Sequence, residues 1–455
     1  MKIISGLRIE KHALGGYGLG FADGKAIFVP YAHPGDEIDA EIIRERKDMA
    51  FARVRHYRLR AEIPRDGLCT SFGPEAACGG CDWQDLSYAS QLRYKLDLLT
   101  ELFSGSGFEA VPKALIPSPQ EVHYRNKVFM PVTSTSEGLI FGIFERNSHK
   151  VVPHHSCRIH PPIFDTLALR VAQICQQAGV TAYNEKSHNG HLRHIGIRIN
   201  QDESQLLLIL VTRGSKLPFS NLLIKKLTEE FPALVGIVQN INRERGNVIL
   251  GDEEKPLWGK PYLSDTLAGK QFRVQYRSFW QVNTPVTELI IARIRKQLEP
   301  GCTLIDAFSG CGSIGISLAD KTRQTICVES NQAAVTDGEH NASRNGVENI
   351  GFVCARCEDA LPTLLEDPAI NVAPLNIVLD PPRSGVLRPA LDAIIASNAS
   401  KIIYLSCSPI TLARDLKILV NEGGYRLSRL QPFDMFPQTW HIECLAFLEK
   451  PVCDT

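Results

Sequence analysis

The chain has 455 residues, with 50 basic and 50 acidic side chains and an apolar content of 44%. This length predicts two to four domains, and the apolar content is ample for packed cores. The balanced charge excludes a chain that is basic overall, so a nucleic-acid partner would need local basic patches. We find no signal-peptide core and no apolar run near the roughly 18 residues of a membrane span, which predicts a cytoplasmic protein without a membrane partner.

Residues 1–60 combine short β-prone runs with glycine-rich turns. Lys25–Pro30 predicts one strand, and acidic and apolar residues alternate through Glu37–Ile43. This pattern favours a small OB-like barrel, a common platform for single-stranded nucleic acid. Four arginines follow without an intervening acid, and they form either a phosphate-binding face or a solvated strand face: Arg53, Arg55, Arg58 and Arg60.

Clustered cysteines come next, in a chain with 13 cysteines in total. Cys69 precedes Cys78-Gly79-Gly80-Cys81, and Cys157 can supply a fourth thiolate. A Cys-x2-Cys hairpin presents two thiolates to one metal, and the two glycines suit a tight backbone turn. Four thiolates fit tetrahedral zinc or an iron–sulfur cluster, and the spacing does not separate the two. The alternative is a set of unrelated buried cysteines.

The middle of the chain predicts an α+β domain. Tyr88–Phe103 is amphipathic and predicts a helix, as does Asn221–Phe231. Basic and apolar residues alternate in Leu192–Ile199, and basic and aromatic residues mix in His123–Val128, which suits RNA contact or an ordinary antiparallel sheet. Further strands are expected at Gln205–Thr212 and Gly236–Asn240.

From about residue 270 strands and helices alternate. A strand through Asp306 leads into Gly310-Cys311-Gly312-Ser313-Ile314-Gly315, a Gly-x-Gly-x-x-Gly pattern that opens a helix. Glu329 ends the next strand, about 20 residues on, where such folds bind a ribose. A dinucleotide-dependent dehydrogenase is the competing interpretation. The pattern Asp306-x-Phe-x-Gly-x-Gly, with its acid inside the first strand, resembles that of class I methyltransferases, which bind S-adenosylmethionine.

Three more acids or thiols lie at predicted strand ends. Asp380 ends the predicted strand Asn376–Asp380. Cys407 lies where the strand that begins at Ile402 stops, in Ser406-Cys407-Ser408-Pro409, and a helix is predicted from Thr411. Carboxyl ends of parallel strands meet at one sheet edge, where open α/β sheets bind ligands. A thiol there can be a nucleophile with a lowered pKa, and Glu443, which starts the last strand, can be a general base. The ordinary alternatives are a helix cap, a buried inert cysteine and a surface acid.

Together the motifs resemble the RNA uracil-C5 methyltransferase family nearly end to end, in the form of its 23S rRNA 5-methyluridine enzymes. The segments that carry the resemblance include Tyr124–Lys127, Leu192–His194, Phe279–Asn283, Asp380-Pro-Pro-Arg, Ser406–Asp415 and His441–Glu443. The resemblance implies a multidomain fold. Its parts are an N-terminal OB-like β-barrel of the TRAM type (1–62), a central α+β domain with the cysteine cluster (63–268) and a C-terminal α/β Rossmann-like class I methyltransferase domain (269–455).

The resemblance also implies roles for single residues. Cys407 would be the nucleophile and Glu443 the base. The cofactor S-adenosylmethionine would be bound by Gln281, Phe308, Ser313, Glu329 and Asp380. A 4Fe-4S cluster would be held by Cys69, Cys78, Cys81 and Cys157. Ser313 and Ser408 stand where the family commonly has asparagine. The implied partner of a monomeric enzyme is 23S rRNA, with tRNA as the alternative substrate and a non-catalytic RNA-binding protein as the alternative function.

Overall fold

The structure is a computed structural model that describes residues 2–76, 78–136, 138–154, 156–217 and 219–451. The chain forms two compact units, and each is built from separate segments. Unit 1 comprises Met1–Tyr94, Gln120–Pro261 and Phe436–His441. Unit 2 comprises Lys95–Pro119, Tyr262–Met435 and Ile442–Thr455.

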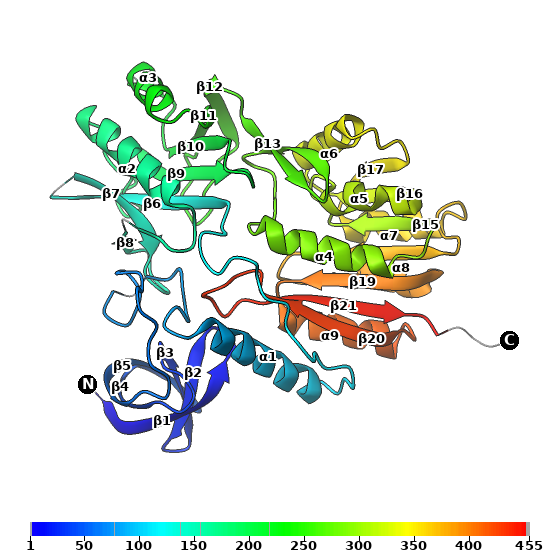
Figure 1. The fold of residues 1–455 in the computed structure, drawn as a ribbon, viewed down its shortest axis with the longest axis horizontal. Helices are drawn as coiled ribbons and strands as arrows, with labels where there is room; N and C mark the ends of the chain where they lie inside the picture. The colour runs from blue at the N-terminus through cyan, green and yellow to red at the C-terminus, as the bar shows by residue number, and fades with distance from the viewer. Residues whose placement is uncertain (1, 77, 137, 155, 218, 452–455) are drawn as a thin grey trace. The chain divides into compact units, whose positions relative to one another are not determined.

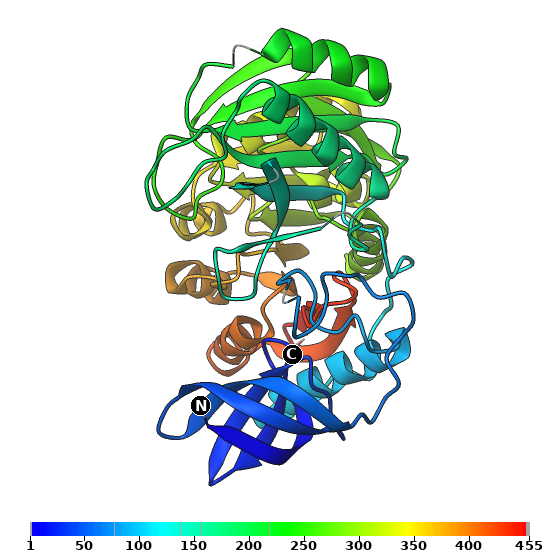
Figure 2. The ribbon, with the colours of Figure 1, turned by 90° about the vertical axis from the view of Figure 1, so that its left-hand side faces the viewer.

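Unit 1 begins with a closed five-stranded barrel, as the sequence predicts (Figure 2). Its strands close in the order β1-β2-β3-β5-β4, where β1 is Ile3–Ala13, β2 Tyr17–Ala22, β3 Lys25–Pro30, β4 Glu37–Glu45 and β5 Met49–Leu59. Alternate side chains point inward, and the core they form includes Ile9, Val29 and Ile38. Outward side chains carry the charge.

The arginines of β5 and the residue after it are paired with acids. Both Arg53 and Arg55 contact Glu41 of the neighbouring strand β4. Arg58 lies 2.7 Å from Asp39, and Arg60 lies 2.7 Å from Asp85. The basic run that is free of acids along the sequence is therefore largely neutralised in space, which weakens the expectation that it forms a phosphate-binding face.

A seven-stranded sheet in the order β12-β11-β10-β9-β6-β7-β8 forms the rest of unit 1 (Figure 1). The strands are β6 (Lys127–Thr135), β7 (Gly138–Phe144), β8 (Val151–Pro153), β9 (Leu192–Ile199), β10 (Leu206–Thr212), β11 (Leu234–Ile241) and β12 (Glu253–Gly259). Helices α2 (Pro162–Gln177) and α3 (Ser220–Glu230) contribute Phe164, Leu167, Leu223 and Leu227 to the core with alternate strand residues. The central α+β prediction agrees with this arrangement.

Unit 2 is organised on a second seven-stranded sheet, in the order β17-β16-β15-β18-β19-β21-β20. The strands are β15 (Cys302–Ala307), β16 (Thr322–Glu329), β17 (Ile350–Cys354), β18 (Leu375–Leu379), β19 (Ala399–Ser406), β20 (Arg426–Phe433) and β21 (Glu443–Glu449). The first five in spatial order are parallel, whereas β21 runs antiparallel to both β19 and β20. Glu443 starts the last strand, as predicted.

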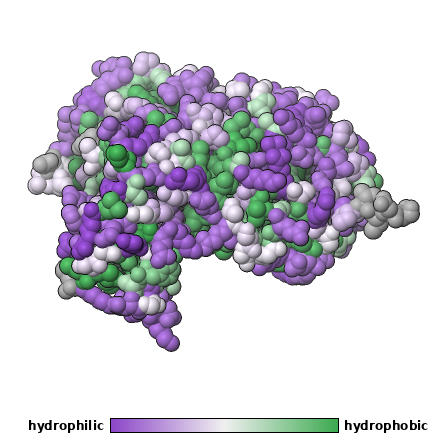
Figure 3. Space-filling model, turned by 60° about the horizontal axis from the view of Figure 1, so that its bottom comes forward, coloured by the Kyte–Doolittle hydropathy of each residue, from purple (hydrophilic) through white to green (hydrophobic). Residues whose placement is uncertain are grey.

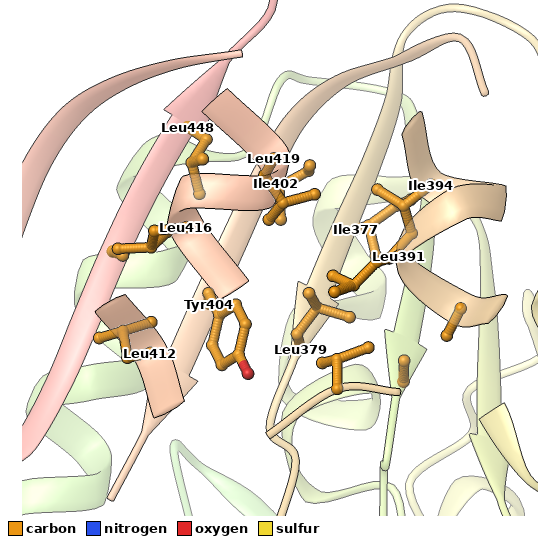
Figure 4. Close-up of a cluster of buried hydrophobic side chains, with 14 of the residues drawn as sticks. Ile377, Leu379, Leu391, Ile394, Ile402, Tyr404, Leu412, Leu416, Leu419 and Leu448 are labelled. Atoms are coloured by element: carbon orange, nitrogen blue, oxygen red, sulfur yellow. The ribbon is translucent and has the colours of Figure 1, made fainter. Parts of the chain in front are cut away.

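Helices connect the successive parallel strands: α5 (Ser313–Leu318) with η1 (Ala319–Lys321), α6 (Gln332–Arg344), α7 (Cys357–Glu366) and α8 (Arg388–Ala396). Two helices precede the sheet in the chain, α1 (Tyr88–Gly105) and α4 (Thr284–Gln297), and α9 (Pro409–Asn421) lies between β19 and β20. A hairpin of β13 (Tyr262–Leu267) and β14 (Lys270–Gln275) precedes α4. One core joins the sheet to α7, α8, α9 and the end of α1, and Figure 4 shows Tyr404 of β19 among its leucines.

The surface is mixed in character. The face in Figure 3 carries mostly hydrophilic residues, with hydrophobic areas between them. None of the helices in the described part of the chain has the length and hydropathy to cross a bilayer.

Candidate active site and cysteine cluster

The loop after β15 is shaped by close backbone approach. Asp306, fully buried at the end of β15, accepts a hydrogen bond of 2.8 Å from the backbone N–H of Gly315. A Cβ at Gly315 would lie 2.7 Å from the sulfur of Cys327, so this position requires glycine. Phe308 has φ +63°, a conformation that non-glycine residues rarely adopt and that gathers at functional sites. The Gly-x-Gly-x-x-Gly pattern is therefore a turn that exposes backbone at the sheet edge.

A pocket lies beside this loop in unit 2. It is lined by four of the predicted cofactor residues together with side chains of α4 and α5: Gln281, Phe308, Ser313 and Asp380. Burial raises the pKa of Asp380 to about 7, while the Gln281 side chain, 3.4 Å away, opposes the shift. Glu329 does not line the pocket, but its carboxylate accepts a 3.0 Å hydrogen bond from the N–H of Gly310. All five predicted cofactor residues thus lie in or next to one site.

The predicted nucleophile and base meet at the end of one strand ladder. Strand β19 pairs antiparallel with β21, and Ser406 faces Cys444 in the register. Extending the ladder by one residue on each strand places Cys407 opposite Glu443. Asp380 leaves β18, the strand on the other side of β19, and its charge acts on Glu443. Residues more than 60 positions apart in the sequence therefore converge at this edge.

Burial dominates the electrostatics of this edge. It raises the pKa of Glu443 well above the ordinary carboxyl value, and Asp380 adds to the shift. Burial also raises the pKa of Cys407, and Glu443 reinforces it. The direction is opposite to the expected lowering of the thiol pKa, because desolvation and the neighbouring acids outweigh the groups that favour the thiolate. The Arg383 guanidinium beside the thiol opposes the shift.

Arg383 is a further functional candidate. It is the last residue of the Asp380-Pro-Pro-Arg motif, and no role was predicted for it from the sequence. Its loop is held by Asp415, a fully buried acid of α9. Asp415 accepts a hydrogen bond of 2.9 Å from the backbone N–H of Val386 and one of 2.7 Å from the Tyr404 hydroxyl. The position of Arg383, three residues after Asp380 at the same sheet edge, was the available signal.

The four predicted metal-ligating cysteines line one pocket in unit 1: Cys69, Cys78, Cys81 and Cys157. All four are free thiols. The Cys78–Cys81 turn is joined to the sheet by a 2.9 Å hydrogen bond from the Gly79 N–H to Phe144 O. A Cβ at Gly79 would lie 2.8 Å from that oxygen, which explains one of the two glycines. Gln84 braces the site by accepting from the Cys69 N–H at 2.5 Å.

The chemistry of this pocket fits a metal centre. Burial raises the pKa of Cys157 to about 12, and burial with the neighbouring thiols raises that of Cys81 well above its usual value. Burial raises the pKa of Cys78 as well, so these three thiols have little tendency to ionise without a positive charge nearby. A bound cationic centre would supply the positive charge that stabilises four thiolates together.

The sequence as a whole was compared with known proteins. Residues 87–451 match the family described as tRNA (uracil-5-)-methyltransferase. The chain belongs to this family. It is thus an RNA (uracil-5-)-methyltransferase that uses S-adenosylmethionine, and the predicted membership of the uracil-C5 methyltransferase family is confirmed.

Individual RNA methyltransferases align with nearly the entire chain. An uncharacterized RNA methyltransferase of Halalkalibacterium halodurans is 35% identical over 445 residues, covering 97% of this chain and 96% of that protein. One from Listeria innocua is 36% identical over 447 residues, with 97% and 96% coverage. The crystal structure of Pyrococcus abyssi tRNA (uracil-54, C5)-methyltransferase in complex with S-adenosyl-L-homocysteine superposes with a TM-score of 0.77 at 26% identity, covering 98% of this chain and 100% of that one.

Proposed function

We propose that this enzyme methylates carbon 5 of one uridine in 23S rRNA through a covalent adduct between Cys407 and carbon 6 of the base. The observation that carries the proposal is the β19–β21 ladder, whose register directs Cys407 and Glu443 to the same edge. Asp380 and Arg383 act electrostatically on both groups. A nucleophile and a base next to a cofactor pocket are the parts that this reaction needs.

The chemistry follows from the electronic structure of uracil. Carbon 5 is a poor nucleophile until the Cys407 thiolate adds to carbon 6 and converts the ring to an enolate. Carbon 5 then attacks the methyl group of the sulfonium, and S-adenosylhomocysteine leaves. Glu443 removes the proton from carbon 5, and elimination breaks the sulfur–carbon bond and releases Cys407. The raised pKa of Glu443 makes its carboxylate a stronger base for that step.

Two groups prepare this reaction. Arg383 favours the thiolate of Cys407 against the effect of burial. In the cofactor pocket, Gln281, Phe308, Ser313 and Asp380 would hold S-adenosylmethionine, and Glu329 would bind its ribose. The target uridine leaves its stack to reach Cys407, at a cost of a few kcal/mol.

We further propose that Cys69, Cys78, Cys81 and Cys157 hold a 4Fe-4S cluster. Methyl transfer consumes no electrons, so the cluster would hold its loops or contact RNA. Protein purified anaerobically should contain about four iron and four sulfide per chain and absorb visible light. A colourless protein with stoichiometric zinc on these cysteines would refute this assignment.

The RNA class rests on the combination of a TRAM-type barrel with a four-cysteine site, which we assign to 23S rRNA enzymes. Transfer RNA is the second candidate, because the family description and the Pyrococcus abyssi enzyme both name tRNA. The barrel (1–62) and the central domain (63–268) would bind an unfolded loop of the RNA substrate. The enzyme would act in the cytoplasm as a monomer. Mapping 5-methyluridine in 23S rRNA and tRNA from a deletion strain distinguishes the two substrates.

The covalent mechanism is tested by two variants that should both lose turnover but differ in what accumulates. Cys407→Ala should form no adduct with RNA that contains 5-fluorouridine. Glu443→Gln should form the methylated adduct with ordinary RNA and fail to release it, visible as a shifted band on a denaturing gel. Cys354→Ala removes an exposed thiol and serves as the matched control. Adduct or turnover in Cys407→Ala would refute the mechanism.

A further inference from the structure

Three buried side chains of unit 1 face one another at the border of the cysteine pocket, and one of them, His154, also lines that pocket. His154 follows β8, His160 precedes α2, and Asp165 lies in the first turn of α2. Their exposed fractions are 4%, 1% and 6%. One nitrogen or oxygen from each lies within 4.8 Å of the others. The sequence analysis assigned no role to this His-x5-His-x4-Asp group.

The distances among these atoms are those of ligands around a shared point. Asp165 Oδ1 lies 3.0 Å from His154 Nδ1 and 3.6 Å from His160 Nε2. None of these three buried atoms has a partner of good hydrogen-bond geometry among the described residues, although the two histidines do interact with the Asp165 carboxylate and, against the effect of burial, lower its pKa. Ligands bound at about 2.0–2.1 Å in a tetrahedral site lie about 3.3 Å apart, between the two distances seen here.

The remaining polar atoms of two of these residues are oriented by outer hydrogen bonds. His160 Nδ1 lies 3.2 Å from the carbonyl oxygen of Pro161, which places the proton on Nδ1 and leaves the Nε2 lone pair free. Asp165 Oδ2 accepts a 2.8 Å hydrogen bond from the backbone N–H of Cys157. Ring and carboxylate positions fixed by a second layer of hydrogen bonds are a property of metal sites.

We propose that His154, His160 and Asp165 bind one divalent cation of the zinc class, at a site separate from the four cysteines. Two imidazole nitrogens and one carboxylate oxygen form a ligand set that zinc prefers, and a water molecule can complete the tetrahedron. The cation balances the buried charge of Asp165 and gives the lone pairs of the two histidines a partner. It also fixes the segment that carries Cys157 to the start of α2.

The site is tested on the full-length protein, purified anaerobically, by metal analysis and zinc-edge X-ray absorption. We expect about one zinc per chain with nitrogen and oxygen ligands and no sulfur, in addition to any metal on the cysteines. His160→Gln should lose this zinc and keep the visible absorbance of the cysteine centre, which also shows that the variant folds. His149→Gln, which alters an exposed histidine 2.8 Å from Glu185, should keep the zinc.

A second measurement does not depend on the metal present at purification. Co²⁺ added to chelator-treated protein should give the visible bands of a tetrahedral ion with N/O ligands and raise the melting temperature, and His160→Gln should show neither effect. Equal metal content in His160→Gln and the parent would overturn the proposal. So would sulfur ligands on the only zinc found, or failure of Co²⁺ to bind the chelator-treated parent. The proposal does not rest on the methyl-transfer mechanism, and neither test measures activity.

Discussion

Replacing Tyr404 with phenylalanine tests how the loop that carries Arg383 is held. The Tyr404 hydroxyl donates a 2.7 Å hydrogen bond to Asp415 Oδ2, and both side chains are fully buried. Hydrogen bonds to charged groups contribute about 1.5–3 kcal/mol to stability. The Val386 N–H and Arg414 continue to serve the carboxylate, and phenylalanine leaves no large cavity. We therefore expect the free energy of unfolding to fall by about 1.5–2 kcal/mol, near the lower end of that range.

The assay is urea unfolding with tyrosine and tryptophan fluorescence, alongside the initial rate of methyl transfer. Tyr425→Phe is the matched control, because its buried hydroxyl donates to a neutral acceptor, Ala399 O, at 3.0 Å. The control should lose only about 0.5–1.5 kcal/mol and keep its rate. Tyr404→Phe should lose more stability and methylate more slowly, since Val386 and the loop before it are held less firmly. Equal effects in the two variants would refute the reasoning.

Three further predictions concern ionisable groups in unit 2. Burial raises the pKa of Asp306 to about 7, so the folded chain keeps a proton that the unfolded chain releases near pH 4. The free energy of unfolding should therefore fall as the pH rises from about 4 to 7. Asp306→Asn should reduce this pH dependence, measured by thermal unfolding. Lys95 lies 2.6 Å from Asp434 with both fully buried, so Lys95→Met should cost about 3–5 kcal/mol in urea unfolding; unchanged stability would contradict this. Arg383→Gln should raise the pKa of Cys407 further and move the pH midpoint of its alkylation by iodoacetamide upward, and an unmoved midpoint would exclude that role.

The elements of unit 2 were predictable because local chemistry marks them. The apolar run Ile402–Leu405 lies in β19, and Pro409 begins the helix that follows. Gly312 has the positive φ of the turn before α5, and Gly315, in the first turns of α5, leaves room for the Cys327 sulfur. Where strands end at polar residues, a parallel sheet brings those residues to one edge, so the approximate position of the site followed from the sequence.

The order of the strands in the sheets could not be predicted from the sequence. The residues that this order brings next to each other could therefore not be predicted either. The last strand, β21, lies between β19 and β20, and this insertion brings Glu443 to Cys407. The acids that neutralise Arg53 and Arg58 come from β4, which the arginine run itself does not indicate. The direction of the thiol pKa shift depended on burial, which no local pattern measures.

The segment Phe436–His441 belongs to unit 1, although the stretch directly before it, Tyr262–Met435, belongs entirely to unit 2. The carbonyl oxygen of Gln438 accepts hydrogen bonds from the backbone N–H groups of Asp82 and Trp83, next to Cys81, at 3.0 and 3.1 Å. During synthesis these two hydrogen bonds to Gln438 can form only after nearly the whole polypeptide has left the ribosome. The cysteine hairpin, made early, therefore reaches its final form late, and a chain shortened before residue 436 would lack the piece that completes it.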